Sequence, residues 1–365
     1  MAERRWSLRF SGRRLAVAAL ALVLVAGLVV VGAVVWQRTH RTHLEEAVSL
    51  VPASSQRVSF TDWAVVRQRL DAQLGDSPDR DAIEGVMEKA YDTDYAAVSS
   101  IDESAAALQE NYGFSPATAQ WEAFAQGKDG ATMVLKVADG ADFDALADNL
   151  LSAGYDSPKE DDGVWQGGVD LVAALDPTIS PELQYVALLA DQGLVVSSDT
   201  AEYAAAAAEV ASGDGSSFAG VDGISDLAGR LGDPANAMLW GKDFACSDLS
   251  MARADQTAQD DADQQVQEAG GVTPLAGLAM AMLPDRTLRV AAHFEDSDQA
   301  EKNLRPRARL AVGEAVGRGG SFADDFTLTS SKAQGSDVVL DLRPKTKTGY
   351  VLSALYDGPV LFATC

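Results

Sequence analysis

The stretch Leu15–Trp36, LAVAALALVLVAGLVVVGAVVW, is an uninterrupted apolar run that decides how the rest of the chain is organised. As a helix its residues extend about 33 Å, enough to cross a hydrocarbon core of roughly 30 Å. Five arginines precede the run and two follow it: Arg4, Arg5, Arg9, Arg13 and Arg14, then Arg38 and Arg41. The excess on the N-terminal side predicts a cytoplasmic N-terminus. We therefore expect a single-pass cell-membrane protein with a cytoplasmic tail over 1–14, a transmembrane helix over 15–36 and an extracellular remainder.

A cleaved signal peptide is the competing interpretation of this run. The apolar part of such a peptide spans about 7 to 15 residues and ends at a small-x-small cleavage site. Here the run is longer and ends in GAVVWQ over residues 32–37. No cysteine stands directly at its end, which argues against a lipoprotein anchor. An uncleaved signal anchor is the prediction.

The charge changes sign after the anchor. Residues 1–43 contain seven Arg and one Glu, a net charge of +6, whereas the remainder has 22 basic and 53 acidic residues and a net charge of −31. Nucleic acid is excluded as an expected partner, because binding it requires Lys and Arg to neutralise phosphates. The acidity favours solubility. A loose reservoir for cations and a docking surface for a basic protein partner in the envelope are the alternatives.

Two cysteines, Cys246 and Cys365, lie in the expected extracellular part. An oxidising compartment permits a disulfide between them. Such a bridge would hold the end of the sequence, whereas the alternative is two buried, unpaired thiols. Nothing in the spacing indicates a metal or a nucleophilic site, and we expect no cofactor.

Periodicity predicts an α+β fold with two related lobes of mixed or antiparallel sheet. A charged juxtamembrane linker is expected over 37–51, with a helix indicated by the spacing of Leu44, Ala47, Val48 and Val51, and it ends at Pro52. The lobes are expected over 52–230 and 231–365. An order of strand, helix, strand, helix, hairpin and helix recurs between them. Residues 131–137 correspond to 287–294, and the hairpin 185–198 corresponds to 326–342, at an offset of about 180 that falls to about 140.

Three further segments separate the corresponding parts. Residues 81–127 are expected to be largely helical, and 255–271, rich in Gln, Asp and Ala, to form a solvated helix or a loop. The apolar segment Val272–Leu283 is too short to span a bilayer. Buried core is its expected role, and a Met-lined surface for a peptide or lipid is the alternative.

The common catalytic patterns are absent from the sequence. It contains no Ser-x-x-Lys and no Gly-x-Ser-x-Gly. Its histidines are His40 and His43 near the membrane and His293 on an expected strand, and all three are interpreted as solvated. Acidic clusters lack the EF-hand spacing. The sequence thus predicts no enzyme, although a pair of distant carboxylates, as in some hydrolases, stays an alternative.

An Asp-aromatic-Ala sequence occurs at the expected start of each lobe. It comprises Asp62 and Trp63 in the first lobe and Asp243 and Phe244 in the second, where Trp240 lies on the preceding strand. Helix capping and core packing explain these residues. Contact with a ligand between the lobes is the alternative that makes them candidate site residues.

The arginine-rich anchor, the Ala-, Val- and Asp-rich remainder, the sequence VSFTDWA at 58–64 and the hairpin-helix unit at 183–210 resemble uncharacterised membrane-anchored envelope proteins of high-GC actinobacteria. The resemblance implies an extracytoplasmic α+β protein with two lobes and no assigned activity. We expect an envelope protein that acts through a partner or as a structural component. The alternatives are a domain that binds or senses a small molecule or lipid, and a carboxylate-based hydrolase.

Overall fold

The computed structural model describes residues 41–75, 78–160, 163–242, 244–249, 251, 254–347, 351–356 and 358–365. The expected cytoplasmic tail and transmembrane helix lie outside these residues. Among the residues described, no helix combines the length and the apolar character needed to cross a membrane. His43–Cys365 form one compact unit, and the following description concerns this unit.

Helices and strands are distributed along the whole of this unit. The elements of its first half are α2 (His43–Val48), β1 (Ser55–Thr61), α3 (Trp63–Arg69), α4 (Arg80–Asp92), α5 (Ala105–Tyr112), β2 (Trp121–Gly127), β3 (Ala131–Lys136), α6 (Phe143–Ala153), β4 (Val164–Gln166), α7 (Val169–Leu175), β5 (Tyr185–Leu189), β6 (Leu194–Ser198), α8 (Ala201–Ser212) and α9 (Ile224–Leu231). Those of the second half are β7 (Asn236–Gly241), α10 (Phe244–Asp248), α11 (Gln256–Ala269), β8 (Gly277–Met282), β9 (Leu288–His293), α12 (Ser297–Leu310), α13 (Phe322–Asp325), β10 (Phe326–Gln334), β11 (Asp337–Pro344) and α14 (Val351–Tyr356).

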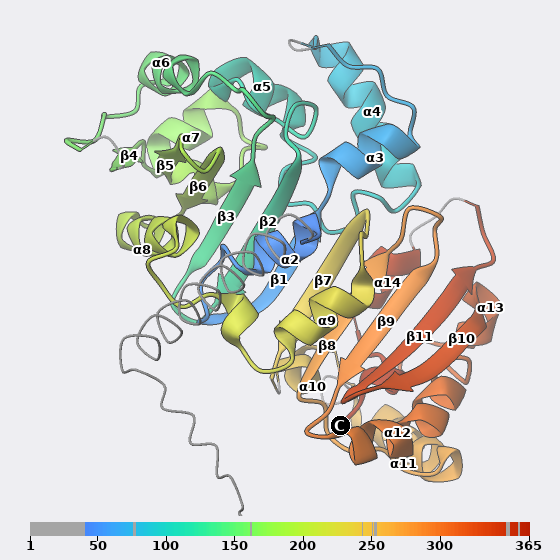
Figure 1. Ribbon diagram of the computed structural model, residues 1–365. Coiled ribbons are helices and arrows are strands. Elements are labelled where there is room, and N and C mark those ends of the chain that lie inside the picture. Colours follow the sequence, from blue (N-terminus) through green and yellow to red (C-terminus); the bar gives the residue numbers. More distant parts are fainter. Residues whose placement is uncertain are drawn as a thin grey trace, which may run out of the picture. The chain divides into compact units, whose positions relative to one another are not determined.

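Across the described residues, eleven strands form one sheet in the order β10-β11-β9-β8-β7-β1-β2-β3-β6-β5-β4 (Figure 1). Neighbouring strands are antiparallel throughout. The halves meet where β1 pairs with β7, with Arg57 opposite Trp240 and Thr61 opposite Asn236. The predicted α+β class is confirmed, and the strands of both halves belong to one antiparallel sheet.

The strand order of one half repeats in the other. Counted outward from the β1–β7 pair, the first half runs β1-β2-β3-β6-β5 and the second runs β7-β8-β9-β11-β10. A helix follows the first strand of each half, α3 or α10, and another follows the third strand, α6 or α12. The sequence correspondences between the strands and between the hairpins agree with this order. The short edge strand β4 has no counterpart in the described part of the second half.

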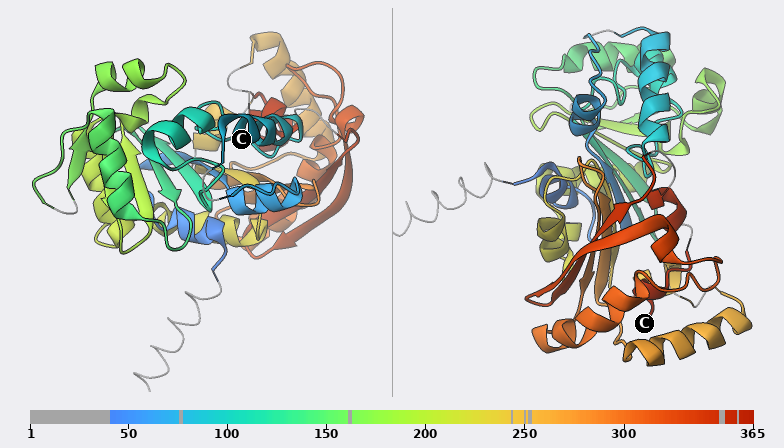
Figure 2. Two further views of the ribbon diagram at one scale, coloured as in Figure 1. Left: turned by 90° about the horizontal axis from the view of Figure 1, so that it is seen from above. Right: turned by 90° about the vertical axis from the view of Figure 1, so that its right-hand side faces the viewer.

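Two hydrophobic clusters cover the two faces of the sheet. The smaller cluster packs α2, α8 and α9 against strand residues that include many alanines, and Figure 1 shows α2 and α9 lying across the central strands. The larger cluster packs the remaining helices and the C-terminal segment against the other face (Figure 2). Strand β8 alternates between them, with Met280 in the larger cluster and Ala279 and Ala281 in the smaller. The expected burial of 272–283 is confirmed for β8, whose six residues are all buried.

For residues 43–51 the expected helix is present, but their assignment to a linker outside the lobes is wrong. Residues 43–48 form α2, which packs against α9, and Leu44, Ala47, Val48 and Val51 are no more than 1% exposed. The apolar positions at helical spacing face the core because α2 lies directly on the sheet. This segment belongs to the folded unit.

The helical interpretation of 81–127 is wrong for its last residues. Helices α4 and α5 lie in this segment, but Trp121–Gly127 form β2, which pairs with β1 on one side and β3 on the other. Trp121, Ala123 and Ala125 all belong to the smaller cluster. Their alternation places one face of the strand against α2 and its neighbours.

The C-terminal segment Gly358–Cys365 is held in the larger cluster. The predicted disulfide between Cys246 and Cys365 is present, with 5.7 Å between the two Cα atoms. Arg307 on α12 donates to the carbonyl oxygens of Phe362 at 2.6 Å and Thr364 at 3.1 Å. A bridge across 119 residues and a buried cation thus fix the end of the chain.

The first prediction concerns this bridge. The variant Cys365→Ser should lower the free energy of unfolding by about 4 kcal/mol, because opening so long a loop restores entropy to the unfolded chain. Urea denaturation of the full chain in detergent measures the loss. A reductant should lower the stability of the wild type to that of the variant and leave the variant unchanged. Equal stability of the oxidised wild type and the variant would contradict the expected contribution.

Candidate functional site

Asp62, a candidate ligand contact, caps α3. Its Oδ1 accepts a hydrogen bond from the Val65 amide at 2.9 Å, and its Oδ2 lies 2.7 Å from Nδ1 of His43. The residue is 4% exposed. The interpretation of His43 as merely solvated is therefore wrong, because its imidazole pairs with this buried carboxylate.

Trp63 is fully buried, and its indole N–H has a carboxylate partner. Nε1 donates to Oε2 of Glu122 at 2.9 Å, while Oε1 of Glu122 accepts from the Ser100 amide at 2.9 Å. Burial raises the pKa of Glu122 to about 7, and these hydrogen bonds counteract the rise. The pair therefore joins the first turn of α3 to β2.

Trp240 is also fully buried, and Phe244 is partly buried against the larger cluster. The indole Nε1 of Trp240 donates to Oδ2 of Asp248 at 2.9 Å. The remaining candidate, Asp243, lies outside the described residues. In the described part, the aromatic candidates of both halves thus form part of the core.

The antiparallel pairing of β1 and β7 keeps these two sets of candidates apart. Thr61, next to Asp62 and Trp63, lies opposite Asn236 at the start of β7, whereas Trp240 lies opposite Arg57. Four residues along a strand correspond to roughly 14 Å. The two sets leave opposite ends of the strand pair and do not form one site.

His293 is buried, so its interpretation as a solvated strand residue is wrong. Its Nδ1 lies 2.6 Å from Oδ1 of Asp337 on β11, and Nε of Arg230 on α9 donates to Oδ2 of Asp337 at 2.8 Å. The hydrogen bond to Asp337 raises the pKa of His293, although burial opposes the rise. This group links α9 to the second half of the sheet.

A cavity of about 530 Å³, here named the α3–α6 pocket, opens between these helices and the segments that precede β2 and α6. Its lining combines polar groups from several segments with apolar residues, of which Phe114, Ala117, Val137 and Leu146 belong to the core and are no more than 6% exposed. The apolar residues include Leu74, Phe114, Ala117, Val137, Ala141 and Leu146, and the polar ones are Arg67, Thr118, Asp139, Asp142 and Asn149. A cavity of this size with a few converging polar groups is typical of a ligand-binding site.

Local sequence signals position the α6 side of the pocket. Asp142 caps the helix, because its Oδ1 accepts from the Ala145 amide at 3.1 Å. Asn149 then donates through Nδ2 to the carbonyl oxygen of Tyr112, the last residue of α5, at 3.2 Å. Gly113 ends α5 at a φ of +79°, and a Cβ there would lie 2.5 Å from Nδ2 of Asn149. Glycine is required at this turn both for its conformation and for the close approach of α6.

Arg67 supplies the positive charge of the pocket. It extends from the last turn of α3 and donates through Nη1 to the carbonyl oxygen of Pro116 at 2.5 Å. Burial lowers its pKa from the ordinary value, against the opposing influence of Asp62. Guanidinium has five N–H donors, so Arg67 can donate to further oxygen atoms of a ligand.

Sequence reasoning did not identify Arg67 or Asn149. Their segments are distant along the chain, and neither belongs to a known motif. One signal was present, because Asp142, Asp144, Asn149 and Leu150 form the pattern D-x-D-x₄-N-L. The same pattern recurs at Asp296, Asp298, Asn303 and Leu304, at the start of α12.

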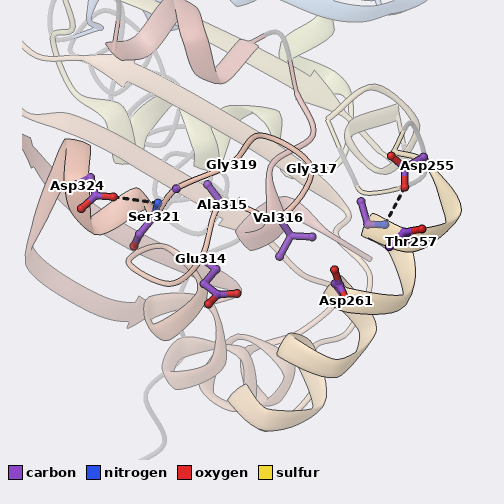
Figure 3. A pocket seen from close by; sticks show the side chains of 12 residues that line it. Asp255, Thr257, Asp261, Glu314, Ala315, Val316, Gly317, Gly319, Ser321 and Asp324 are labelled. Atoms are coloured by element: carbon purple, nitrogen blue, oxygen red, sulfur yellow. Dashed lines mark hydrogen bonds between the residues drawn. The ribbon is translucent and has the colours of Figure 1, made fainter.

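A second hollow, of about 640 Å³, lies between α11 and residues 314–321 (Figure 3). Two of its carboxylates cap helices: Asp255 accepts from the Ala258 amide at 2.9 Å, and Asp324 accepts from the Ser321 amide at 3.1 Å. Within the described ranges, no group of three or more His, Cys, Asp or Glu side chains is placed to hold a metal ion. Capping accounts for these two acids.

A third cavity, of about 400 Å³ and here named the junction pocket, is lined by residues from both halves. Asp94 accepts from the Leu352 amide at 2.9 Å and from the Ser353 hydroxyl at 3.1 Å, which attaches α14 to the first half. Burial raises the pKa of Asp94, and it raises that of Asp102, also in the lining, to about 6. Two acids with raised pKa values thus line this cavity.

Comparison with known proteins gives one distant structural likeness. No protein family matches the sequence, and no curated protein matches it. The solved structure of crystal form I of TP0453 aligns with a TM-score of 0.37 and 8% sequence identity, over 85% of this chain and 98% of that chain.

The second prediction concerns the His43–Asp62 pair. The hydrogen bond to Asp62 raises the pKa of His43, burial lowers it, and nearby carboxylates raise it further. Since an unfolded histidine has a pKa of about 6.5, the stabilisation is complete below that pH and is lost as the pH rises through the higher folded-state pKa. His43→Asn should therefore lower the urea midpoint of the full chain more at pH 5.5 than at pH 8.5. An equal loss at both values would show that the pair is not charged.

Proposed function

We propose that this chain is a membrane-anchored extracytoplasmic protein that binds a partner through the α3–α6 pocket. The observation that carries the proposal is the pocket itself, a cavity of about 530 Å³ on which polar groups from several segments converge. This volume falls within the usual range for ligand sites, roughly 300 to 1,000 Å³.

The membrane part of the proposal rests on the sequence. Leu15–Trp36 is long enough for a transmembrane helix, and the arginine excess before it favours an N-terminus in the cytoplasm. The disulfide between Cys246 and Cys365 supports an oxidising compartment for the folded unit, since such bridges are rare in the cytosol. An envelope location outside the cell membrane satisfies both features.

The polar groups of the pocket favour binding over catalysis. Asp142 is engaged in capping α6, Asn149 in holding α5, and Asp139 accepts from the side chain of Gln120 at 3.0 Å. Arg67 is a donor that keeps its proton in proteins. These residues can orient a ligand, and their chemistry offers no activated nucleophile.

A carboxylate-based hydrolase is the second candidate, and the junction pocket favours it. Asp94 and Asp102 line this pocket with raised pKa values, as a general acid requires. However, both carboxylate oxygens of Asp94 already accept hydrogen bonds from the start of α14. Attachment of α14 explains Asp94 without a reaction, so we place binding first.

The third prediction tests the pocket in the intact membrane. Ala145 lines the pocket and is exposed, whereas Asp148 is exposed on the same helix outside the lining. With p-benzoylphenylalanine at position 145, ultraviolet light should produce a covalent adduct in cells of the organism that makes the protein. The same group at position 148 should give several-fold less adduct, because it lies outside the cavity.

The comparison of positions 145 and 148 makes this test specific, and the variant Arg67→Gln tests the role of the guanidinium. It should reduce the adduct at position 145 by removing the donor from the pocket. Absence of an adduct at both positions, or equal adducts at both, would contradict binding in the α3–α6 pocket.

A further inference from the structure

The second half contains the counterparts of the elements that form the α3–α6 pocket. In the repeated strand order, α10 corresponds to α3 and α12 corresponds to α6. Asp296 caps α12 by accepting from the Gln299 amide at 2.8 Å, as Asp142 caps α6. Both helices therefore begin at the same point of the pattern D-x-D-x₄-N-L.

The shared geometry of the two halves extends to the asparagine of this pattern. Asn303 donates through Nδ2 to the hydroxyl of Thr273 at 2.7 Å, and its Oδ1 accepts from the Thr273 amide at 3.0 Å. Thr273 precedes β8, just as Tyr112, the partner of Asn149, precedes β2. In each half this asparagine joins the helix after the third strand to the segment before the second.

The chain's own C-terminal segment occupies the region beside α10 and α12. Val360, Leu361, Phe362 and Ala363 are no more than 2% exposed. The Val360 amide donates to the carbonyl oxygen of Leu249, directly after α10, at 2.7 Å. In the second half these elements thus bind an apolar segment, whose residues Leu361–Ala363 form a short 3-10 helix.

A buried guanidinium holds the main chain of that segment. Arg307 donates to the carbonyl oxygens of Phe362 and Thr364, and it also donates to the carbonyl oxygen of Thr273 at 2.6 Å. Arg67 in the first half likewise donates to a main-chain carbonyl, that of Pro116. Unlike Arg307, however, Arg67 lines an open cavity.

We propose that the α3–α6 pocket binds an apolar peptide segment of a partner protein, with Arg67 donating to its main-chain carbonyl groups. This inference rests on the proposed function and specifies its ligand class. Asp139 and Asp142 also line the pocket, so the bound segment carries no excess of negative charge. The segment Gly358–Cys365, GPVLFATC, is the example of such a peptide that the chain itself provides.

The experiment uses a fluorescein-labelled peptide with the sequence of 358–365 and serine in place of the final cysteine. Its fluorescence anisotropy is titrated with the full chain held in lipid nanodiscs, and empty nanodiscs provide the background. Saturable binding is expected. Ala145→Trp should weaken binding at least tenfold by filling the cavity, Arg67→Gln should weaken it, and Asp148→Trp should leave it unchanged.

A second peptide, with aspartate in place of the phenylalanine, tests the apolar requirement and should bind at least tenfold more weakly. Failure of the apolar peptide to bind, or binding that Ala145→Trp does not affect, overturns the peptide assignment. If the adduct at position 145 still forms in that case, the proposed function stands with another ligand class. If the adduct is also absent, both proposals fail.

Discussion

The pairing of β1 with β7 is the interaction on which the rest of the structure depends. Each of these strands is hydrogen-bonded on both sides, to the other and to a strand of its own half. Buried side chains cover both of their faces, including Val58 in one cluster and Trp240 in the other. Because the pairing is antiparallel, α3 and α10 leave opposite ends of the strand pair. The helices that follow β1 and β7 therefore cover opposite ends of the sheet, and each half has a separate helical layer.

The two halves complete that layer in different ways. In the second half, Arg307, the disulfide and residues 360–363 close the space beside α12 with the chain itself. Burying apolar side chains stabilises the fold by about 25 cal/mol for each Å² removed from water. In the first half, the α3–α6 pocket lies open beside α6, above the core residues Leu146 and Phe114. The two halves thus differ in whether a segment of the chain itself fills the space beside this helix.

The sequence predicted the strands that carry clear apolar periodicity, such as β3, β9 and the two hairpins. The sequence did not predict β2, because Glu122 is a fully buried acid that interrupts the apolar pattern of this strand.

The pocket was not predictable from periodicity. Its wall comes from separate segments around Arg67, residues 113–118 and residues 137–149, which only the folded sheet brings together. The tryptophans were misleading because a buried indole needs both a large apolar surface and a hydrogen-bond acceptor. Trp63 and Trp240 find that acceptor in a nearby acid, within the core.

The charge of the chain limits which ligands the proposed site can bind. The chain beyond residue 43 has a net charge of −31, and this charge repels acidic molecules before they reach the surface. Asp139 and Asp142 add negative charge to the lining of the pocket, and Arg67 contributes a positive charge there. Since Arg67 is partly buried, its hydrogen bonds are stronger than those of a solvated arginine. For the proposed ligand, long-range repulsion therefore disfavours acidic segments, whereas the guanidinium of Arg67 favours a neutral segment with free carbonyl groups.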